Sequence, residues 1–164
     1  MIEHAVQLAK ALDAEDYEAA MNHLAQGCTY ELRGRVIEGA DAIIASYRTA
    51  GEAGKDRFDA IRYESSVSPV GTDGARIDYT DIVTIAGHTH AHRCAQEVSL
   101  DGDGLVSHIR HIDLEGERER LHQFEAMHAR EGRSGGASGH CPHCATKQEH
   151  HEGSWRGRKR PPSP

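Results

Sequence analysis

The chain has 164 residues, of which 37% are apolar and 27% charged, and its formal net charge is −7. Residues 130–164 hold seven Lys/Arg and three Asp/Glu, which leaves −11 for residues 1–129. An acidic body excludes the basic face that nucleic-acid-binding domains present, so we expect no nucleic-acid partner for the folded part. No stretch approaches the roughly 20 apolar residues of a membrane span, and the first residues carry an early acid, unlike a signal peptide. The four cysteines do not form a secreted disulfide framework, so we expect a cytoplasmic protein.

Hydrophobic periodicity and turn residues predict the secondary structure. In chain order we expect helices at 2–12 and 15–26, short strands at 29–32 and 35–38, a helix at 40–50 closed by Gly51 and Gly54, four strands at 58–67, 75–86, 88–100 and 105–113, and a helix at 114–130. Helices segregated from antiparallel strands indicate an α+β fold. We expect one pocket domain at 1–130 and a disordered, basic, His/Cys-containing tail at 131–164, where apolar residues are too few to offset the entropy of ordering.

The turn at 101–104 predicts how the last two strands pair. Pairing Leu100 with Leu105 and assuming no bulge, partner numbers keep a constant sum along the ladder. The facing pairs are then Val98–Ser107, Gln96–Ile109, Cys94–His111 and His92–Asp113. Their apolar members mark this as the inner face, while the other face, with Arg93, Glu97, His108 and Arg110, is expected to meet solvent or a second subunit.

Acid/base chemistry is one interpretation of the polar end of this inner face. A histidine facing an aspartate across a ladder has its tautomer fixed, and a partly buried carboxylate has a raised pKa. Asp113 with His92 or His111 is therefore the predicted acid/base pair. Asp81, a carboxylate among apolar residues on the neighbouring strand, is either a further pocket residue or a structural hydrogen-bonding group.

Metal binding is the second interpretation. Alternate histidines on one strand plus a ligand across the ladder suit an open zinc site, which would use His90, His92 and His111. In the tail, Cys141, His143 and Cys144 are spaced for zinc, although a tail without metal is the simpler reading. The acid/base interpretation requires no cofactor.

Several other side chains are expected to line the pocket and contact a ligand, with core packing as the alternative. They are Tyr17, Tyr30, Tyr79, His90, Cys94 and Gln96.

Five stretches within residues 1–128 carry a family resemblance: 12–19 (LDAEDYEA), 24–31 (LAQGCTYE), 38–43 (EGADAI), 102–106 (GDGLV) and 111–113 (HID). They resemble the nuclear-transport-factor-2-like superfamily and, within it, the SnoaL-like branch. The resemblance implies a cone-shaped, curved antiparallel sheet of cystatin-like type wrapped around N-terminal helices. It also implies an internal pocket and a homodimer formed through the outer sheet face.

Members of the superfamily include ketosteroid isomerases, polyketide cyclases and dehydratases, and also proteins that only bind. Ala9 and Leu32 stand where the isomerases carry their tyrosine and aspartate, whereas Asp113 matches the acid/base aspartate of SnoaL-type cyclases. Three functions stay open for a chain that takes a small-molecule ligand. The first is an acid/base enzyme of lyase, isomerase or hydrolase type. The second is a non-catalytic module that binds a ligand or partner, and the third is a metal-dependent protein that uses the histidine-rich strand.

Overall fold

The structure is a computed structural model that describes residues 2–129. Its elements are α1 (Glu3–Asp13), α2 (Tyr17–Met21), β1 (Leu24–Leu32), β2 (Arg35–Glu38), α3 (Ala40–Arg57), β3 (Ala60–Val70), β4 (Gly74–Ile85), β5 (His88–Leu100), β6 (Val106–Asp113) and α4 (Glu117–His128). The predicted tail at 131–164, with Cys141, His143 and Cys144, lies outside the described residues. Within the described part, no helix combines the length and apolarity needed to cross a membrane.

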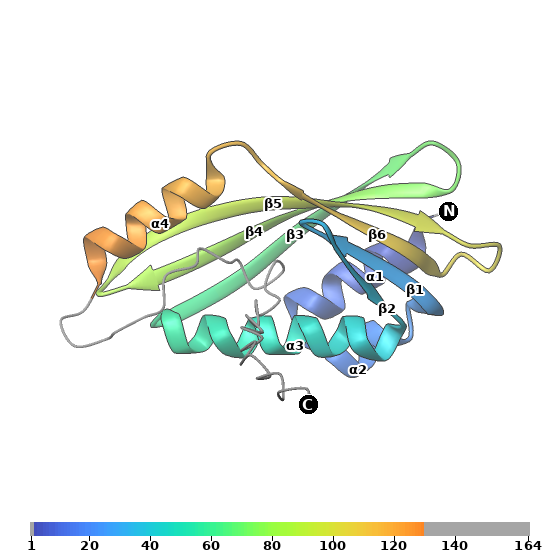
Figure 1. Cartoon of the computed structure of the whole chain (residues 1–164), viewed down its shortest axis with the longest axis horizontal. Helices are drawn as coiled ribbons and strands as arrows, with labels where there is room; N and C mark the ends of the chain where they lie inside the picture. The colour runs from blue at the N-terminus through green and yellow to red at the C-terminus, as the bar shows by residue number, and fades with distance from the viewer. Residues whose placement is uncertain (1, 130–164) are drawn as a thin grey trace, which may run out of the picture.

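One curved sheet of six strands organises the fold, in the order β2-β1-β6-β5-β4-β3. The helices α1, α2 and α3 lie against one face of it, and α4 lies along the far end of β4 and β5 (Figure 1). The predicted α+β architecture is confirmed. The sheet is nevertheless mixed, because β1 pairs with β6 in parallel, so the expectation of a wholly antiparallel sheet is wrong for that pair.

The apolar core is divided into two clusters. The larger one joins α1, α2 and α3 to the sheet and includes Leu8, Ile43 and Ile109, all fully buried. The smaller one lies beneath α4 and consists of Phe58, Val83, Ile85, Leu121 and Phe124. We call the sheet face that contacts both clusters the inner face.

The predicted helix at 15–26 is wrong for its last residues, because a turn follows Met21 and β1 begins at Leu24. Asp16 caps α2 by accepting a hydrogen bond from the Ala19 amide at 3.0 Å, but the helix ends at Met21. The His23 carbonyl then accepts a bond from the Val106 amide, and Leu24 pairs with Val106. Sheet pairing with a strand 80 residues later therefore overrides the local helical pattern.

Gly51 and Gly54 do not end the third helix, which continues to Arg57. Both glycines are buried on its inward side. A Cβ built on Gly51 would stand 2.5 Å from the Tyr17 hydroxyl. The absent side chain therefore lets α3 pass close to α2, and glycine here is a packing requirement rather than a stop signal.

The predicted pairing of β5 with β6 is wrong by two residues. Asp101 closes the turn by accepting bonds from the amides of Asp103 at 3.0 Å and Leu105 at 2.9 Å. Leu100 then pairs with Val106, and a bulge makes Ser99 pair with His108. A shift of two residues keeps every side chain on its predicted face but changes its partner.

Candidate functional site

Register across the sheet arranges the inner face in rows, because cross-strand partners project to the same side. The rows are Ile61–Val83–His90, then Tyr63–Asp81–His92, then Ser65–Tyr79–Cys94–Asp113, and then Val67–Ile77–Gln96–His111. We call the second and third rows the polar band. The band lies between the smaller apolar cluster, which contains Val83, and the larger one, which contains Ile77.

His92 stands in the polar band with its ring almost fully enclosed, at 2% exposure. Neither ring nitrogen has a partner at hydrogen-bonding distance and angle, although the Glu117 backbone is close enough to act on the ring. Asp81, 1% exposed, is its direct partner on β4, which places the two Cβ atoms about 5 Å apart. Burial lowers the pKa of His92 below its usual value, although the carboxylates of Asp81 and Glu117 oppose the shift. At neutral pH the imidazole is therefore neutral and has both donor and acceptor capacity to offer.

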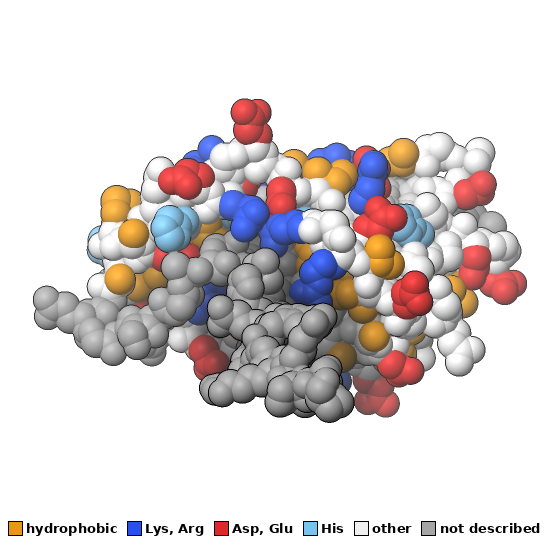
Figure 2. All heavy atoms as spheres, in the orientation of Figure 1, with side chains coloured by type: hydrophobic (Ala, Val, Ile, Leu, Met, Phe, Trp, Pro, Cys, Tyr) orange, Lys and Arg blue, Asp and Glu red, His pale blue; other side chains and the backbone are white. Residues whose placement is uncertain are grey.

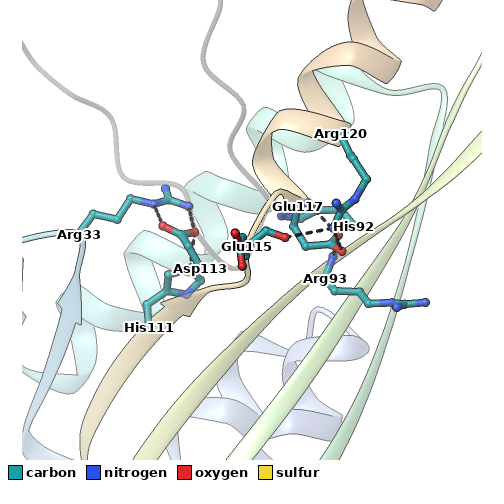
Figure 3. Close-up of polar contacts among 8 residues, drawn as sticks. All are labelled: Arg33, His92, Arg93, His111, Asp113, Glu115, Glu117 and Arg120. Atoms are coloured by element: carbon teal, nitrogen blue, oxygen red, sulfur yellow. Dashed lines mark hydrogen bonds and ion pairs between the residues drawn. The ribbon is translucent and has the colours of Figure 1, made fainter.

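Glu117, the first residue of α4, borders His92 on its other side (Figure 3). Its carboxylate accepts a hydrogen bond from the Arg93 amide at 2.9 Å and from Arg120 at 2.6 Å, and lies 3.9 Å from Nδ1 of His92. Burial pushes the pKa of Glu117 up, but the bonds from Arg120 and the Arg93 amide outweigh it and leave the pKa below its usual value.

The end of β6 explains this arrangement. The strand ends at Asp113, opposite Cys94, so β6 offers no carbonyl to the amide of Arg93. The Glu117 side chain takes that place, and the helix starts here because Gly116 adopts a left-handed φ of 73°. The predicted start at residue 114 is wrong for this reason.

Asp113 belongs to a second polar group, separate from His92 (Figure 3). Its carboxylate receives bonds from Arg33 at 2.7 and 2.6 Å and lies 3.0 Å from Nε2 of His111. Burial raises the pKa of Asp113, but Arg33 and His111 overcome it and hold the pKa far below the usual range. Asp113 is therefore an ionised clamp for Arg33 and His111. The predicted contact between His92 and Asp113 is wrong because of the two-residue shift.

Arg33 reaches Asp113 from the two-residue turn between β1 and β2. It adopts a left-handed φ of 49° and Gly34 a φ of 81°, as a type I′ hairpin turn requires. The parallel pairing of β1 with β6 brings this turn to the end of β6.

The predicted ligand-binding residues Tyr30 and Gln96 form a bonded network deeper in the fold. Tyr47 donates to the Gln96 carbonyl oxygen at 3.1 Å, and the Gln96 amide donates to the Tyr30 hydroxyl at 3.3 Å. The rings of Tyr30 and Tyr47 stack at 5.5 Å, and burial raises the pKa of both. Gln96 lies in the row next to the polar band, so this network anchors the band's neighbouring row.

The remaining predicted ligand-binding residues lie around the band. Tyr79 and Cys94 are in it and buried, and burial raises the pKa of each. His90 is stacked on Phe124 of α4, with ring centroids 5.2 Å apart. Tyr17 lies at the α1–α2 side, where its hydroxyl donates to Glu15 at 3.5 Å and burial raises its pKa to about 12.

The histidines predicted to bind metal are not brought together. Within residues 2–129, no three His, Cys, Asp or Glu side chains are grouped as metal ligands. His90 and His92 lie in adjacent rows of the inner face, whereas His111 lies two rows beyond His92, opposite Gln96, and contacts Asp113. The predicted set of His90, His92 and His111 is therefore wrong as a ligand set, because it relied on the unshifted register.

Comparison with known proteins gives no match to any family model and none to a curated protein. Solved structures do match. TerC, co-crystallised with polyporic acid, shares 14% identity at a TM-score of 0.58, over 76% of this chain and 97% of TerC. The NTF2-like protein from Exiguobacterium sp. 255-15 shares 14% identity at a TM-score of 0.52, over 68% of this chain and 98% of its own.

This chain has the NTF2-like fold. A third structure of the same fold is RV0760c from Mycobacterium tuberculosis in complex with estradiol-17β-hemisuccinate. It shares 14% identity at a TM-score of 0.52, over 70% of this chain and 93% of RV0760c. Two of these NTF2-like structures therefore hold a small organic molecule, so the fold is one that binds small molecules.

Sequence reasoning missed Arg33, Glu117 and Tyr63 as members of the site. Arg33 had a usable signal, because an Arg-Gly pair between two short strands indicates a tight hairpin turn. Tyr63 alternates with the other inner-face residues of its strand. Glu117 gave no such signal, because its role depends on which residue of β5 lies opposite the last residue of β6, and that register was not predicted.

Proposed function

We propose that this NTF2-like protein binds a small organic molecule over the polar band and catalyses proton transfer on it through His92 and Asp81. The observation that carries the proposal is the buried, neutral His92, whose two nitrogens make no hydrogen bond although each would in most proteins. A bound ligand would supply the missing partner. The two ligand-bound structures of the same fold support a small molecule as that partner.

The geometry assigns different tasks to the two carboxylates nearest His92. A neutral imidazole accepts a proton from the ligand, and the Asp81 carboxylate across the ladder stabilises the resulting imidazolium. Glu117, 3.9 Å from Nδ1, holds the ring from the other side. Such a site suits a lyase, isomerase or hydrolase that moves a proton without a cofactor.

Asp113 is proposed as a positioning residue rather than the acid. Its ion pair with Arg33 keeps it ionised, so it is a weak base and has no proton to donate near neutral pH. By bonding to His111 it fixes the end of β6, from which the chain leads to Glu117.

The test combines binding and turnover on the full-length chain. Polyporic acid, estradiol-17β-hemisuccinate and a general library of ring-containing compounds are screened by thermal shift, and each compound that binds is followed by mass spectrometry for conversion. We expect His92→Gln to abolish conversion, whereas His122→Gln, an exposed histidine on α4, keeps it. If a compound binds but is not converted, the catalytic part of the proposal is wrong and the protein is a ligand-binding module. Conversion that survives His92→Gln would refute the proposed base.

We also propose a cytoplasmic homodimer formed through the outer sheet face. That face carries cross-strand ion pairs, such as Arg110 with Glu97, that are suited to a polar interface. Cys28 and Cys94 are buried and neither is in a disulfide, which fits a reducing compartment. Sedimentation of the wild-type chain and an Arg110→Glu variant tests the dimer, which we expect the charge reversal to weaken.

A further inference from the structure

We propose that the ligand presents a cationic nitrogen, such as a protonated amine next to an aromatic ring, to the polar band between Asp81 and His92. This inference rests on the proposed binding function and names the chemical class of its ligand.

Charge around the band is the first ground. Asp81 is central in its row and 1% exposed. Asp13, at the end of α1, covers the adjacent row by accepting a hydrogen bond from Ser65 at 2.5 Å. Two carboxylates thus approach the same patch from opposite sides, one from the sheet and one from the helix layer.

Three cations near the site are bound to other carboxylates. Arg33 bonds to Asp113, Arg120 to Glu117, and Lys55 to Glu15 at 2.8 Å. Carboxylates near the site raise the pKa of two tyrosines: Asp81 and Glu15 raise that of Tyr63, and Asp13 raises that of Tyr79. An anionic ligand group would therefore meet like charge there, while a cation would be attracted.

His92 is the second, independent ground, because a buried side chain with two unbonded nitrogens indicates a missing partner. Burial keeps it neutral, so one nitrogen is an acceptor for an ammonium hydrogen. Tyr63 pairs with Asp81 across the ladder and Tyr79 lies two residues away on the same strand, so two aromatic rings of the kind that bind cations are neighbours of Asp81.

The net charge of the folded domain favours the same class of ligand. Residues 1–129 carry a net charge of −11, and a field of this sign attracts cationic ligands and repels acids. This differs from the acidic compounds held by the two structural neighbours, so the ligand class separates this chain from them.

The experiment compares three compounds that share one ring and differ in charge: tryptamine, tryptophol and indole-3-acetate. Binding to the full-length chain is measured by NMR at the imidazole resonances of His92, which are assigned with His92→Gln. We expect tryptamine to bind at least about tenfold more tightly than indole-3-acetate, with tryptophol between them. Asp81→Asn should reduce that preference to within about twofold.

Asp78→Asn is the matched control, because Asp78 is on the same strand but on the outer face, paired with Arg76. It should keep the preference for tryptamine. Equal or tighter binding of indole-3-acetate overturns the inference, as does a preference that survives Asp81→Asn or the absence of any tryptamine shift at His92. If an acid or neutral compound is nevertheless converted in a His92-dependent way, the proposed function stands and only the ligand class fails.

Discussion

Removal of the Glu117 carboxylate tests how the end of the sheet supports His92. Glu117→Ala deprives the Arg93 amide of its acceptor and Arg120 of its partner. A hydrogen bond to a charged group contributes about 1.5–3 kcal/mol, and an ion pair three residues apart on a helix adds roughly 0.2–0.5 kcal/mol. We therefore expect a loss of about 2–3 kcal/mol in the free energy of unfolding. Glu117→Gln retains an oxygen for the Arg93 amide and should cost only about 0.5–1.5 kcal/mol.

The assay is urea unfolding of the full-length variants, with hydrogen exchange at the Arg93 amide as a local readout. Glu119→Ala is the control, because Glu119 is on the same helix and bonds only an exposed Gln123 in the described contacts. Loss of the Glu117 charge should also lower the pKa of His92 further, since that carboxylate raises it. Equal stability of the Glu117→Ala and Glu119→Ala variants, with unchanged exchange at Arg93, would refute the argument.

Three further changes probe the fold and its titration. The pKa of His92 lies below its usual value in the folded chain, so the free energy of unfolding should decrease as the pH drops below about 6.5. Urea unfolding at several pH values should show a smaller decrease for His92→Gln than for the wild-type chain. Asp113→Asn should cost about 1–2 kcal/mol at neutral pH, allowing for partial exposure. That difference should persist to about pH 4 and close below it, because the pKa of Asp113 is lowered; a pH-independent difference would contradict the ion pair with Arg33. Gly74→Ala places a Cβ 2.8 Å from the Val70 carbonyl oxygen and should lower the free energy of unfolding in urea by about 1–3 kcal/mol. Gly27→Ala, whose Cβ would have nothing within 4 Å, should change it by no more than about 0.5 kcal/mol.

The alternation of side chains allowed the sequence to predict the inner face. The strand at 88–100 has the bounds predicted for it, and Asp81, His92 and Gln96 are all buried on the side expected. Period-2 patterning survives a register shift of two residues, so face assignment is robust where partner assignment is not.

The partners of the site residues could not be predicted, because they depend on a turn and on a strand end. The carboxylate of Asp101 organises a longer turn than the simple pairing assumed, which moves Asp113 away from His92. The end of β6 at residue 113 was predicted, but the role of Glu117 depends on the shifted register, which makes β6 stop opposite Cys94 and leaves the Arg93 amide to the Glu117 side chain. The same holds for the strand at 24–28, which only the later β6 makes extended.

The position of β6 in the sheet has a consequence for the order of folding. This strand lies between β1 and β5, so the first third of the chain gains its central neighbour only when residues 106–113 are present. Until then β1 and β5 each expose an open edge, which invites association with other chains. During synthesis the third row of the polar band, which includes Asp113, and the link between β1 and β5 are therefore completed last, when residues 106–113 pair with both strands.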